Sequence, residues 1–211
     1  MRKAMLLEVL YHRHGWWPRR RVLQAGGLAL VGMAAGIPLP GAAQEALPPT
    51  PQCDGGKGHA TPRQTAGPFY TPNTPQRASL LEAGTKGAPI MVTGMVLNTR
   101  CEPLAGALLD FWQANADGVY DNEGYTMRGH QFTDAKGQYR LETVRPGLYP
   151  GRTRHIHVNV QAPHGQVLTT QLYFPKEAGN TQDSIFDERL VVAMPPSAAN
   201  PVARFDFVLP G

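Results

Sequence analysis

The chain has 211 residues, 42% of them hydrophobic and 17% charged, and its formal net charge at pH 7 is +4. This length is enough for one domain with a buried core. The first 43 residues hold six basic residues and one acidic residue, a net charge of +5, so the rest of the chain carries about −1. Because the net positive charge comes from this segment and no basic helix follows it, the composition excludes a nucleic-acid-binding protein.

Residues 1–43 have the layout of an export signal. Three arginines at 19–21 precede an apolar run rich in Gly and Ala at 25–39, and the small residues at 41–43 suit a cleavage site. The run is about 15 residues long, whereas a membrane span needs about 20. We therefore predict a twin-arginine-type signal peptide rather than an anchor, with no stable membrane span after processing. The mature protein is expected in the periplasm or outside the cell.

Residues 44–62 are rich in Pro, Gln and Gly and carry little apolar pattern, so we expect an extended arm or linker. Cys53 lies in this arm and Cys101 lies in a turn further along the chain. An even number of cysteines in an exported protein favours a disulfide, which would tie the arm to that turn. Two free thiols are the alternative.

Residues 63–211 are expected to form one all-β domain. Apolar runs alternate with turns rich in Gly, Asn, Asp and Pro, which is typical of a β-sandwich with few helices. One helical turn is expected at 79–83. The candidate strands are residues 90–97, 107–113, 138–144, 155–161, 168–174, 190–194 and 203–209.

A loop tyrosine is the first candidate for chemistry along the chain. Tyr120 follows the candidate strand at 107–113 and a turn that contains Gly118. Binding and catalytic residues often lie on such loops. Taken alone, Tyr120 is an ordinary loop residue.

The segment with the most chemistry runs from Pro146 to His157. Side chains alternate between the faces of a strand, so His155 and His157 point the same way and lie roughly 6–7 Å apart along it. Two imidazoles at this spacing can bind one metal ion, and the phenolate of Tyr149 suits Fe(III) better than Zn(II). Arg152 lies between the tyrosine and the histidines. Two structural histidines beside a turn tyrosine are the alternative interpretation.

Taken together, these motifs resemble the intradiol ring-cleavage dioxygenases, non-haem Fe(III) enzymes that open catechols between the two hydroxyl groups. The resemblance extends from about Arg63 to Phe207. Its matching parts are residues 64–70 (QTAGPFY), 111–115 (FWQAN), 118–120 (GVY), 146–150 (PGLYP), 152–157 (RTRHIH) and 170–174 (TQLYF). The turn and strand at 133–139 also occur in unrelated transthyretin-like sandwiches. Two tyrosines ahead of Arg-x-x-His-x-His form the more specific part of the pattern.

The resemblance assigns roles by position. It implies that Fe(III) is the cofactor and that Tyr149 also acts as a base. Arg152 would face the substrate, with Gln171 behind it. The implied iron ligands are Tyr120, Tyr149, His155 and His157, and the implied pocket residues are Gly67, Pro68 and Phe69. His59, His130 and His164 match no ligand position and are expected to be surface or structural residues. Arg128 and Arg154 are expected to be solvated or ion-paired rather than catalytic.

The implied reaction inserts both atoms of O2 into a catechol-type ring and gives a muconate-type diacid. The segment between Tyr149 and His155 is shorter than in well-known members, and Gly151 follows Pro150 where they carry an aromatic residue. This predicts a more open site and a larger, substituted or polyphenolic catechol. The sequence leaves assembly into a homo-oligomer open.

Two other functions fit parts of the pattern. A non-catalytic transthyretin-like sandwich that binds a carbohydrate or a protein would explain the strands and turns, but not the ordered candidate ligands. A His-x-His zinc or manganese site would need a third His or a carboxylate, and the tyrosines would be incidental. Metal content distinguishes these functions: iron, none, or zinc and manganese.

Overall fold

The computed structural model describes residues 53–54, 57–194 and 201–210. The expected signal peptide at 1–43 and the first part of the expected arm lie outside these residues. Within the described ranges, no helix combines the length and the apolarity needed to cross a membrane.

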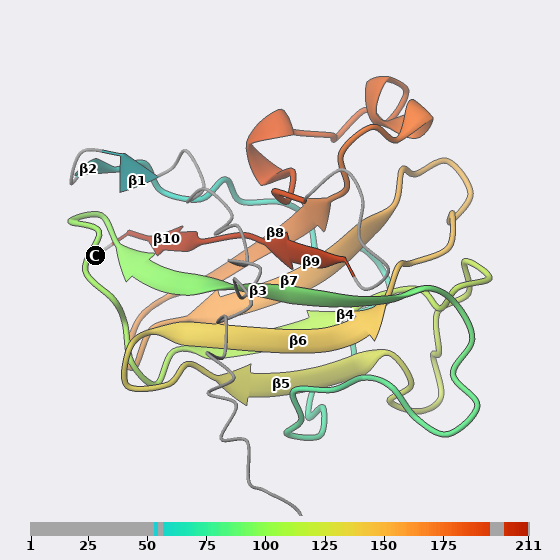
Figure 1. The fold of residues 1–211 in the computed structure, drawn as a ribbon, viewed down its shortest axis with the longest axis horizontal. Coiled ribbons are helices and arrows are strands. Elements are labelled where there is room, and N and C mark those ends of the chain that lie inside the picture. Colours follow the sequence, from blue (N-terminus) through green and yellow to red (C-terminus); the bar gives the residue numbers. More distant parts are fainter. Residues whose placement is uncertain (1–52, 55–56, 195–200, 211) are drawn as a thin grey trace, which may run out of the picture. The chain divides into compact units, whose positions relative to one another are not determined.

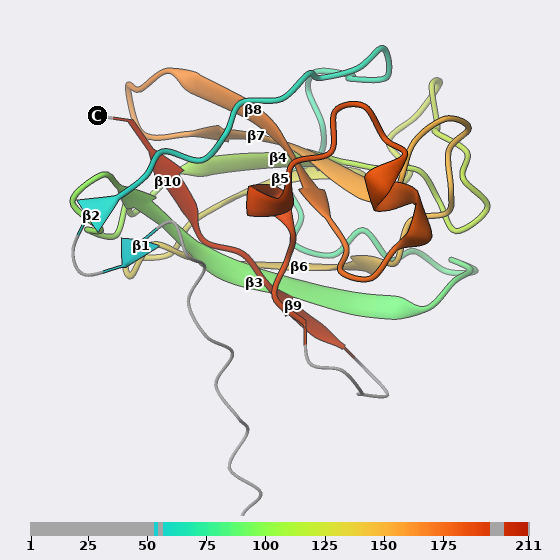
Figure 2. The same ribbon diagram turned by 90° about the horizontal axis from the view of Figure 1, so that it is seen from above.

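Two four-stranded sheets form a sandwich, which confirms the predicted fold class (Figures 1 and 2). One sheet has the order β5–β4–β7–β8, and each pair of adjacent strands in it is antiparallel. Its strands are β4 (Leu108–Trp112), β5 (Arg128–Phe132), β7 (His155–Gln161) and β8 (Val167–Tyr173).

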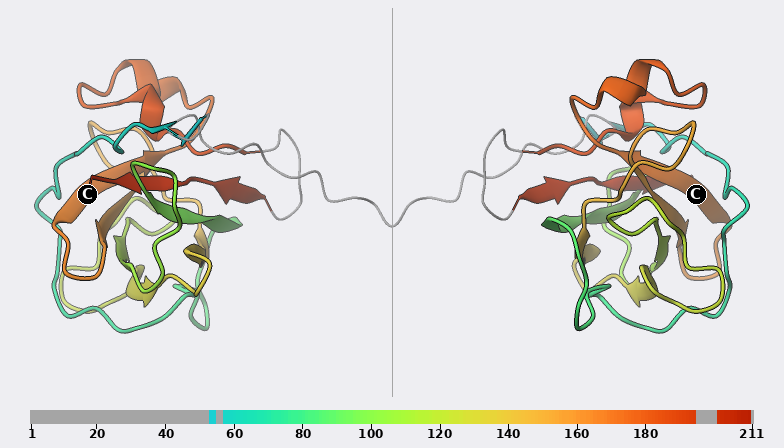
Figure 3. Two further views of the ribbon diagram at one scale, coloured as in Figure 1. Left: turned by 90° about the vertical axis from the view of Figure 1, so that its left-hand side faces the viewer. Right: turned by 90° about the vertical axis from the view of Figure 1, so that its right-hand side faces the viewer.

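The second sheet is built around the long strand β3 (Pro89–Asn98), which pairs antiparallel with β6 (Gln138–Val144). The C-terminal strands β9 (Val202–Arg204) and β10 (Phe207–Leu209) run parallel to β3. Two short 3-10 helices, η1 (Ala178–Thr181) and η2 (Glu188–Leu190), lie beyond the β8 edge of the first sheet (Figure 3).

Strand β7 divides its side chains between an inner and an outer face. Ile156, Val158 and Val160 are fully buried in the core between the sheets. Because side chains alternate, His155 and His157 project from the outer face. There they meet a second apolar cluster, which consists of Trp112, Ala114 and Tyr120, with Ala66, Phe69 and Tyr149 packed against it.

Two predicted elements are absent from the structure, and three strands of the structure were not predicted. No helix forms at 79–83, because this segment bonds to the edge of β6 instead: Leu80 N–H donates to the Glu142 carbonyl at 2.8 Å. The run at 190–194 forms only isolated bridges, at Val191 and Ala193, after η2. Strand β5 and the short hairpin of β1 (Cys53–Asp54) and β2 (Lys57–Gly58) were not predicted.

The predicted C-terminal strand is divided in two at Phe205 and Asp206. The Asp206 carboxylate, rather than a backbone carbonyl, accepts the N–H of Met95 at 2.9 Å. The Phe205 carbonyl turns toward β3, where a Cβ at Gly94 would come within 1.7 Å of it. The interruption therefore depends on glycine at position 94.

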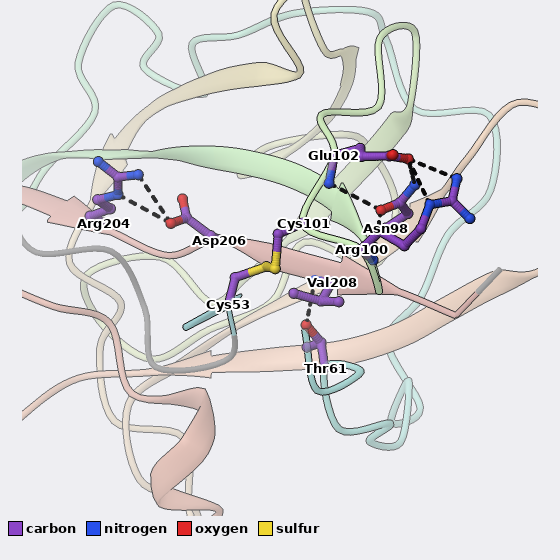
Figure 4. Close-up of a disulfide and its surroundings, with 9 residues drawn as sticks. All are labelled: Cys53, Thr61, Asn98, Arg100, Cys101, Glu102, Arg204, Asp206 and Val208. Atoms are coloured by element: carbon purple, nitrogen blue, oxygen red, sulfur yellow. Dashed lines mark hydrogen bonds and ion pairs between the residues drawn. A yellow bond between two sulfur atoms is a disulfide. The ribbon is translucent and has the colours of Figure 1, made fainter. Parts of the chain in front are cut away.

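The predicted Cys53–Cys101 disulfide is present, with its Cα atoms 5.8 Å apart (Figure 4). Beyond it, Thr61 and Val208 exchange two hydrogen bonds: Thr61 N–H donates to the Val208 carbonyl at 2.9 Å, and Val208 N–H donates to Thr61 Oγ1 at 2.8 Å. Further on, Gln64 N–H donates to the Thr169 carbonyl of β8 at 2.8 Å. The end of the expected arm (44–62) is thus bonded to β10. The residues that follow it bond to β8 and lead to the outer face of β7, and residues 59–69 are called the N-terminal arm below.

Candidate active site

Two loops present Tyr120 and Tyr149 on the outer face of the first sheet. In the first loop the Asn115 side chain accepts the N–H groups of Asp117 and Val119, both at 3.0 Å, which closes the turn before Tyr120. The backbone of the second loop bonds to the first, because Gly147 N–H donates to the Asn115 carbonyl at 2.7 Å. The two tyrosines are thereby fixed relative to each other, with ring centroids 5.7 Å apart.

His155 has one ring nitrogen free to bind a metal. Its Nδ1 lies 2.7 Å from the Thr153 carbonyl, which can only accept, so Nδ1 carries the proton and donates. Nε2 therefore keeps its lone pair, and the Tyr120 hydroxyl lies 3.1 Å from it. A hydrogen bond that fixes the tautomer in this way is the usual arrangement behind a metal-binding imidazole.

His157 lies between an aromatic ring and the N-terminal arm. Its imidazole stacks on Trp112 with a centroid distance of 4.9 Å and an interplanar angle of 3°. The Thr65 carbonyl lies beside it, but its buried Nδ1 has no partner within hydrogen-bond geometry among the described residues. On the arm side, a Cβ at Gly67 would come within 3.5 Å of the imidazole.

Phe69 completes the packing around the tyrosines. Its ring stacks on Tyr120 at a centroid distance of 4.5 Å and meets Tyr149 edge-on at 5.3 Å. The two imidazole centroids are 4.8 Å apart, and the Tyr120 ring is 6.2 Å from His157. The four predicted ligands are therefore brought into one cluster. Tyr149 is its half-buried member, and the other three are buried.

Burial controls the charge of these side chains. It lowers the pKa of His155 to about 4 and that of His157 well below the ordinary value, so both imidazoles are neutral at neutral pH. Burial raises the pKa of the Tyr120 hydroxyl well above its usual range, although the positive charges of Arg152 and Arg128 oppose this. Among the described residues there is no metal-binding cluster of three or more His, Cys, Asp or Glu side chains. The available donor set is two imidazole nitrogens and two phenol oxygens.

Arg152 is held beside this cluster by three side chains. Its Nε donates to Asp183 at 2.8 Å, and its Nη2 donates to Gln171 Oε1 at 2.7 Å. The Tyr173 hydroxyl is 3.4 Å from Nη2. Gln171 in turn donates to the Thr65 carbonyl at 3.0 Å, so the predicted pair of Arg152 and Gln171 is linked to the arm.

Arg128 corrects a prediction, because it is neither solvated nor paired with a carboxylate. It is 1% exposed, and it donates to the backbone carbonyls of Phe69 at 2.6 Å and Asp121 at 3.0 and 2.5 Å. It therefore fixes the arm to the segment that follows Tyr120.

The other predicted non-ligand side chains lie outside the cluster. His130 is half-buried and contacts Thr74, whereas His59 and His164 are exposed. Arg154 pairs with Glu177 at 3.3 Å, as expected.

A cleft of about 540 Å³ opens beside the cluster. Tyr149, Arg152, Asp183, Glu177 and Gln182 are among the residues that line it. The predicted pocket residues lie elsewhere: Gly67 and Phe69 pack on the candidate ligands, and Pro68 is exposed. A groove of about 580 Å³ over β3 and β6 contains none of the candidate donors.

Comparisons with known proteins agree on one family. A family model described as Dioxygenase matches residues 65–211. The beta chain of protocatechuate 3,4-dioxygenase from Burkholderia cepacia is 36% identical over 118 residues, which cover 47% of this chain and 50% of that protein. Catechol 1,2-dioxygenase from Candida albicans is 32% identical over 148 residues, which cover 57% of this chain and 49% of that protein. The chain belongs to the intradiol ring-cleavage dioxygenase family. It spans about half the length of these curated relatives.

Solved structures of this family have the same fold. The dioxygenase domain of a dioxygenase carbohydrate-binding protein fusion from Streptomyces sp. SirexAA-E is 52% identical, with a TM-score of 0.70. The match covers 72% of this chain and 98% of that domain. Hydroxyquinol 1,2-dioxygenase from Pseudomonas putida DLL-E4 is 25% identical, with a TM-score of 0.64 over 72% and 67% of the two chains. The intradiol dioxygenase sandwich is therefore common to this chain and to relatives that are named for different activities.

Three residues at this intradiol-type site were not predicted to contribute. Trp112 was part of a recognised motif, but its stacking on His157 depends on the pairing of β4 with β7. Asp183 had no motif around it, and its contact with Arg152 spans 31 residues. Arg128 is part of β5, whose sequence lacks the apolar alternation of a half-buried strand.

Proposed function

We propose that this chain is an Fe(III)-dependent intradiol dioxygenase that inserts both atoms of O2 into a catechol-type ring and gives a muconate-type diacid. The observation that carries the proposal is the convergence of two neutral imidazoles and two phenols beside a fixed guanidinium. Family membership and the activities for which the relatives are named support it.

The chemistry of the donor set fits ferric iron. Neutral imidazoles can bind a metal without first losing a proton. The two phenols lose their protons most readily when they bind a highly charged cation. His155, His157, Tyr120 and Tyr149 would hold the metal. Fe(III), when bound, would act as a Lewis acid that favours the doubly deprotonated form of a catechol.

The residues around the donors supply the remaining functions. Tyr149 is half-buried and lines the cleft, and as a phenolate it would take a proton from a substrate hydroxyl at its Oη. Arg152 stays charged, so its guanidinium would stabilise negative charge that develops on the ring. Phe69 covers the tyrosines and reduces their contact with water.

We propose a substituted or polyphenolic catechol as the substrate, because the cleft extends beyond Tyr149 and Arg152 to Glu177 and Gln182. Gly151 leaves open space, since a Cβ there would meet nothing within 4 Å. A series of catechols with increasing ring substituents tests this. Higher kcat/KM for the larger substrates is expected, and activity confined to unsubstituted catechol would contradict it.

The experiment that tests the function is the visible spectrum of the purified mature protein, with metal analysis, before and after a catechol is added without oxygen. We expect bound iron and a reddish tyrosinate-to-iron band that shifts with the catechol. Admission of oxygen should then give a diacid. A protein that stays colourless after ferric reconstitution would reject the proposal in favour of a binding module, and bound zinc or manganese would favour the His-x-His alternative.

We also propose export through the twin-arginine signal at 19–21, followed by cleavage near 41–43. The arginines, the apolar run and the small residues support this. Cell fractionation should find the processed protein outside the cytoplasm. Replacement of Arg19 and Arg20 by lysine should retain it inside, and unchanged export would argue against this route.

A further inference from the structure

We propose that Asp183 is a positioning residue that directs the Arg152 guanidinium toward the substrate. This inference rests on the proposed dioxygenase function and extends it to a residue outside the recognised motifs. Asp183 follows η1 in the chain, and it contacts Arg152 where both residues line the cleft.

Both carboxylate oxygens of Asp183 are occupied. Oδ2 accepts from Arg152 Nε at 2.8 Å and from Thr153 N–H at 3.0 Å, and Oδ1 accepts from Ile185 N–H at 3.1 Å. The Asp183 side chain is only 1% exposed. Three donors around a buried carboxylate leave it one orientation, so the Nε side of the guanidinium is fixed as well.

The remaining nitrogens of Arg152 are divided between the protein and the cleft. Nη2 donates to Gln171, whereas Nη1 makes no hydrogen bond with any side chain or carbonyl in the described ranges. Because Arg152 also lines the cleft, these contacts leave Nη1 for a substrate. Asp183 therefore holds the guanidinium in the orientation in which Nη1 can contact the reacting ring.

Glu177, which also lines the cleft, already pairs with Arg145 and Arg154, and Asp187 pairs with Arg189. Without Asp183 the guanidinium would keep only neutral partners, Gln171 and Tyr173, and it would turn toward water. Asparagine at position 183 cannot restore the arrangement, because its NH2 group would face one of the N–H donors.

The segment that holds Asp183 is itself anchored. Thr153 Oγ1 donates to Asn180 Oδ1 at 2.7 Å, and Asn180 Nδ2 donates to the Phe174 carbonyl at 3.0 Å. Asp183 thus stands on a segment that is bonded to the end of β8 and to the residue after Arg152. This gives the carboxylate the rigidity that a positioning role needs.

A double-mutant cycle of Asp183→Asn and Arg152→Ala on the iron-loaded protein tests the inference. We expect Asp183→Asn to lower kcat/KM for a catechol by roughly 10²-fold, the order of loss that misplacement of a catalytic group produces. Arg152→Ala should lose at least as much, and the double variant should be within twofold of Arg152→Ala. Asp187→Asn is the matched control: this carboxylate in the same segment caps η2 and pairs with Arg189, and it should keep kcat/KM within twofold of wild type.

The possible results separate this inference from the proposed function. A wild-type protein with the tyrosinate–iron band but no ring cleavage would overturn both. An active wild type in which Asp183→Asn changes kcat/KM less than twofold would overturn the inference alone, as would an equal loss on the Arg152→Ala background. If Asp183→Asn does not fold, Asn180→Ala loosens the same segment. It should then lower kcat/KM in wild type and not in Arg152→Ala, and equal losses in both would overturn the inference.

Discussion

Gly118 and Gly147 lie backbone against backbone, and their contact joins the loop of Tyr120 to the loop of Tyr149. A Cβ at Gly147 would come within 2.1 Å of Gly118 N, and a Cβ at Gly118 would come within 2.1 Å of the Leu148 carbonyl oxygen. Real Cβ atoms do not tolerate such distances, so the relative position of the two tyrosines depends on glycine at both sites.

Gly147→Ala is expected to push the two loops apart. Overpacking of this kind costs about 1–3 kcal/mol, and the displaced Tyr149 should weaken the tyrosinate band. Urea unfolding and the visible spectrum measure the two effects. Gly84→Ala is the control, because a Cβ there meets nothing within 4 Å and only its φ of +85° is unfavourable. It should leave the band unchanged, and an unchanged band in Gly147→Ala would contradict the argument.

Tyr149→Phe is expected to bind iron through the three remaining donors, with an altered colour and a slow turnover. Loss of a general base lowers the rate by roughly 10²–10⁴-fold. Absorption spectra and kcat measure this, and Tyr125→Phe serves as a surface control, because the hydroxyl of this exposed tyrosine donates to the Pro72 carbonyl at 3.2 Å. If spectrum and rate are both unchanged, Tyr149 is neither ligand nor base.

The metal-free protein is expected to lose stability as the pH falls from about 6.5 to about 4. The pKa of His155 is about 4 in the folded state, below the value near 6.5 of an unfolded histidine. In this window the unfolded chain binds the proton first, so acidification favours unfolding by on the order of 3 kcal/mol from His155, and His157 acts in the same direction. Urea midpoints across this range should show the slope, and His155→Gln should flatten it. The exposed His164→Gln should not, and an equally steep profile in His155→Gln would exclude this origin.

Arg128→Met is expected to lower the free energy of unfolding by about 2–4 kcal/mol, because two backbone carbonyls lose their donors. Release of the Phe69 carbonyl should also loosen the arm over the tyrosines and raise KM. Arg63→Met is the matched control, since this exposed arginine also donates to one backbone carbonyl, that of Val167 at 2.8 Å. Similar small losses in both variants would show that Arg128 does not hold the arm.

Sequence patterns located strands whose burial follows a simple period. β6 and β7 have the predicted bounds because their apolar residues alternate on the core side. β5 was not predicted, because its buried residues Arg128 and Gln131 are polar and find their partners in other segments. Gln131 Oε1, for example, accepts the Arg140 N–H at 3.2 Å. Burial of this kind follows from tertiary pairing and leaves no local signal.

The same limit applies to the site. The candidate ligands could be named because they lie on short motifs, and strand alternation placed both histidines on one face. Asp183 could not be named, because it lies in no motif and reaches Arg152 only through the fold of the segment after β8. The length of the loop after Tyr149 predicted an open site, but the residues of the cleft wall had to come from the structure.

The Cys53–Cys101 bond closes a ring of chain that includes the whole N-terminal arm. A protease that cut the exposed turn at 82–84 would therefore leave the two fragments joined as long as the bond is oxidised. The arm would stay at a high effective concentration beside β8 and β10, and its hydrogen bonds could re-form after local opening. A nicked molecule would keep its ligand cluster covered, and the same nick would release the arm only after reduction.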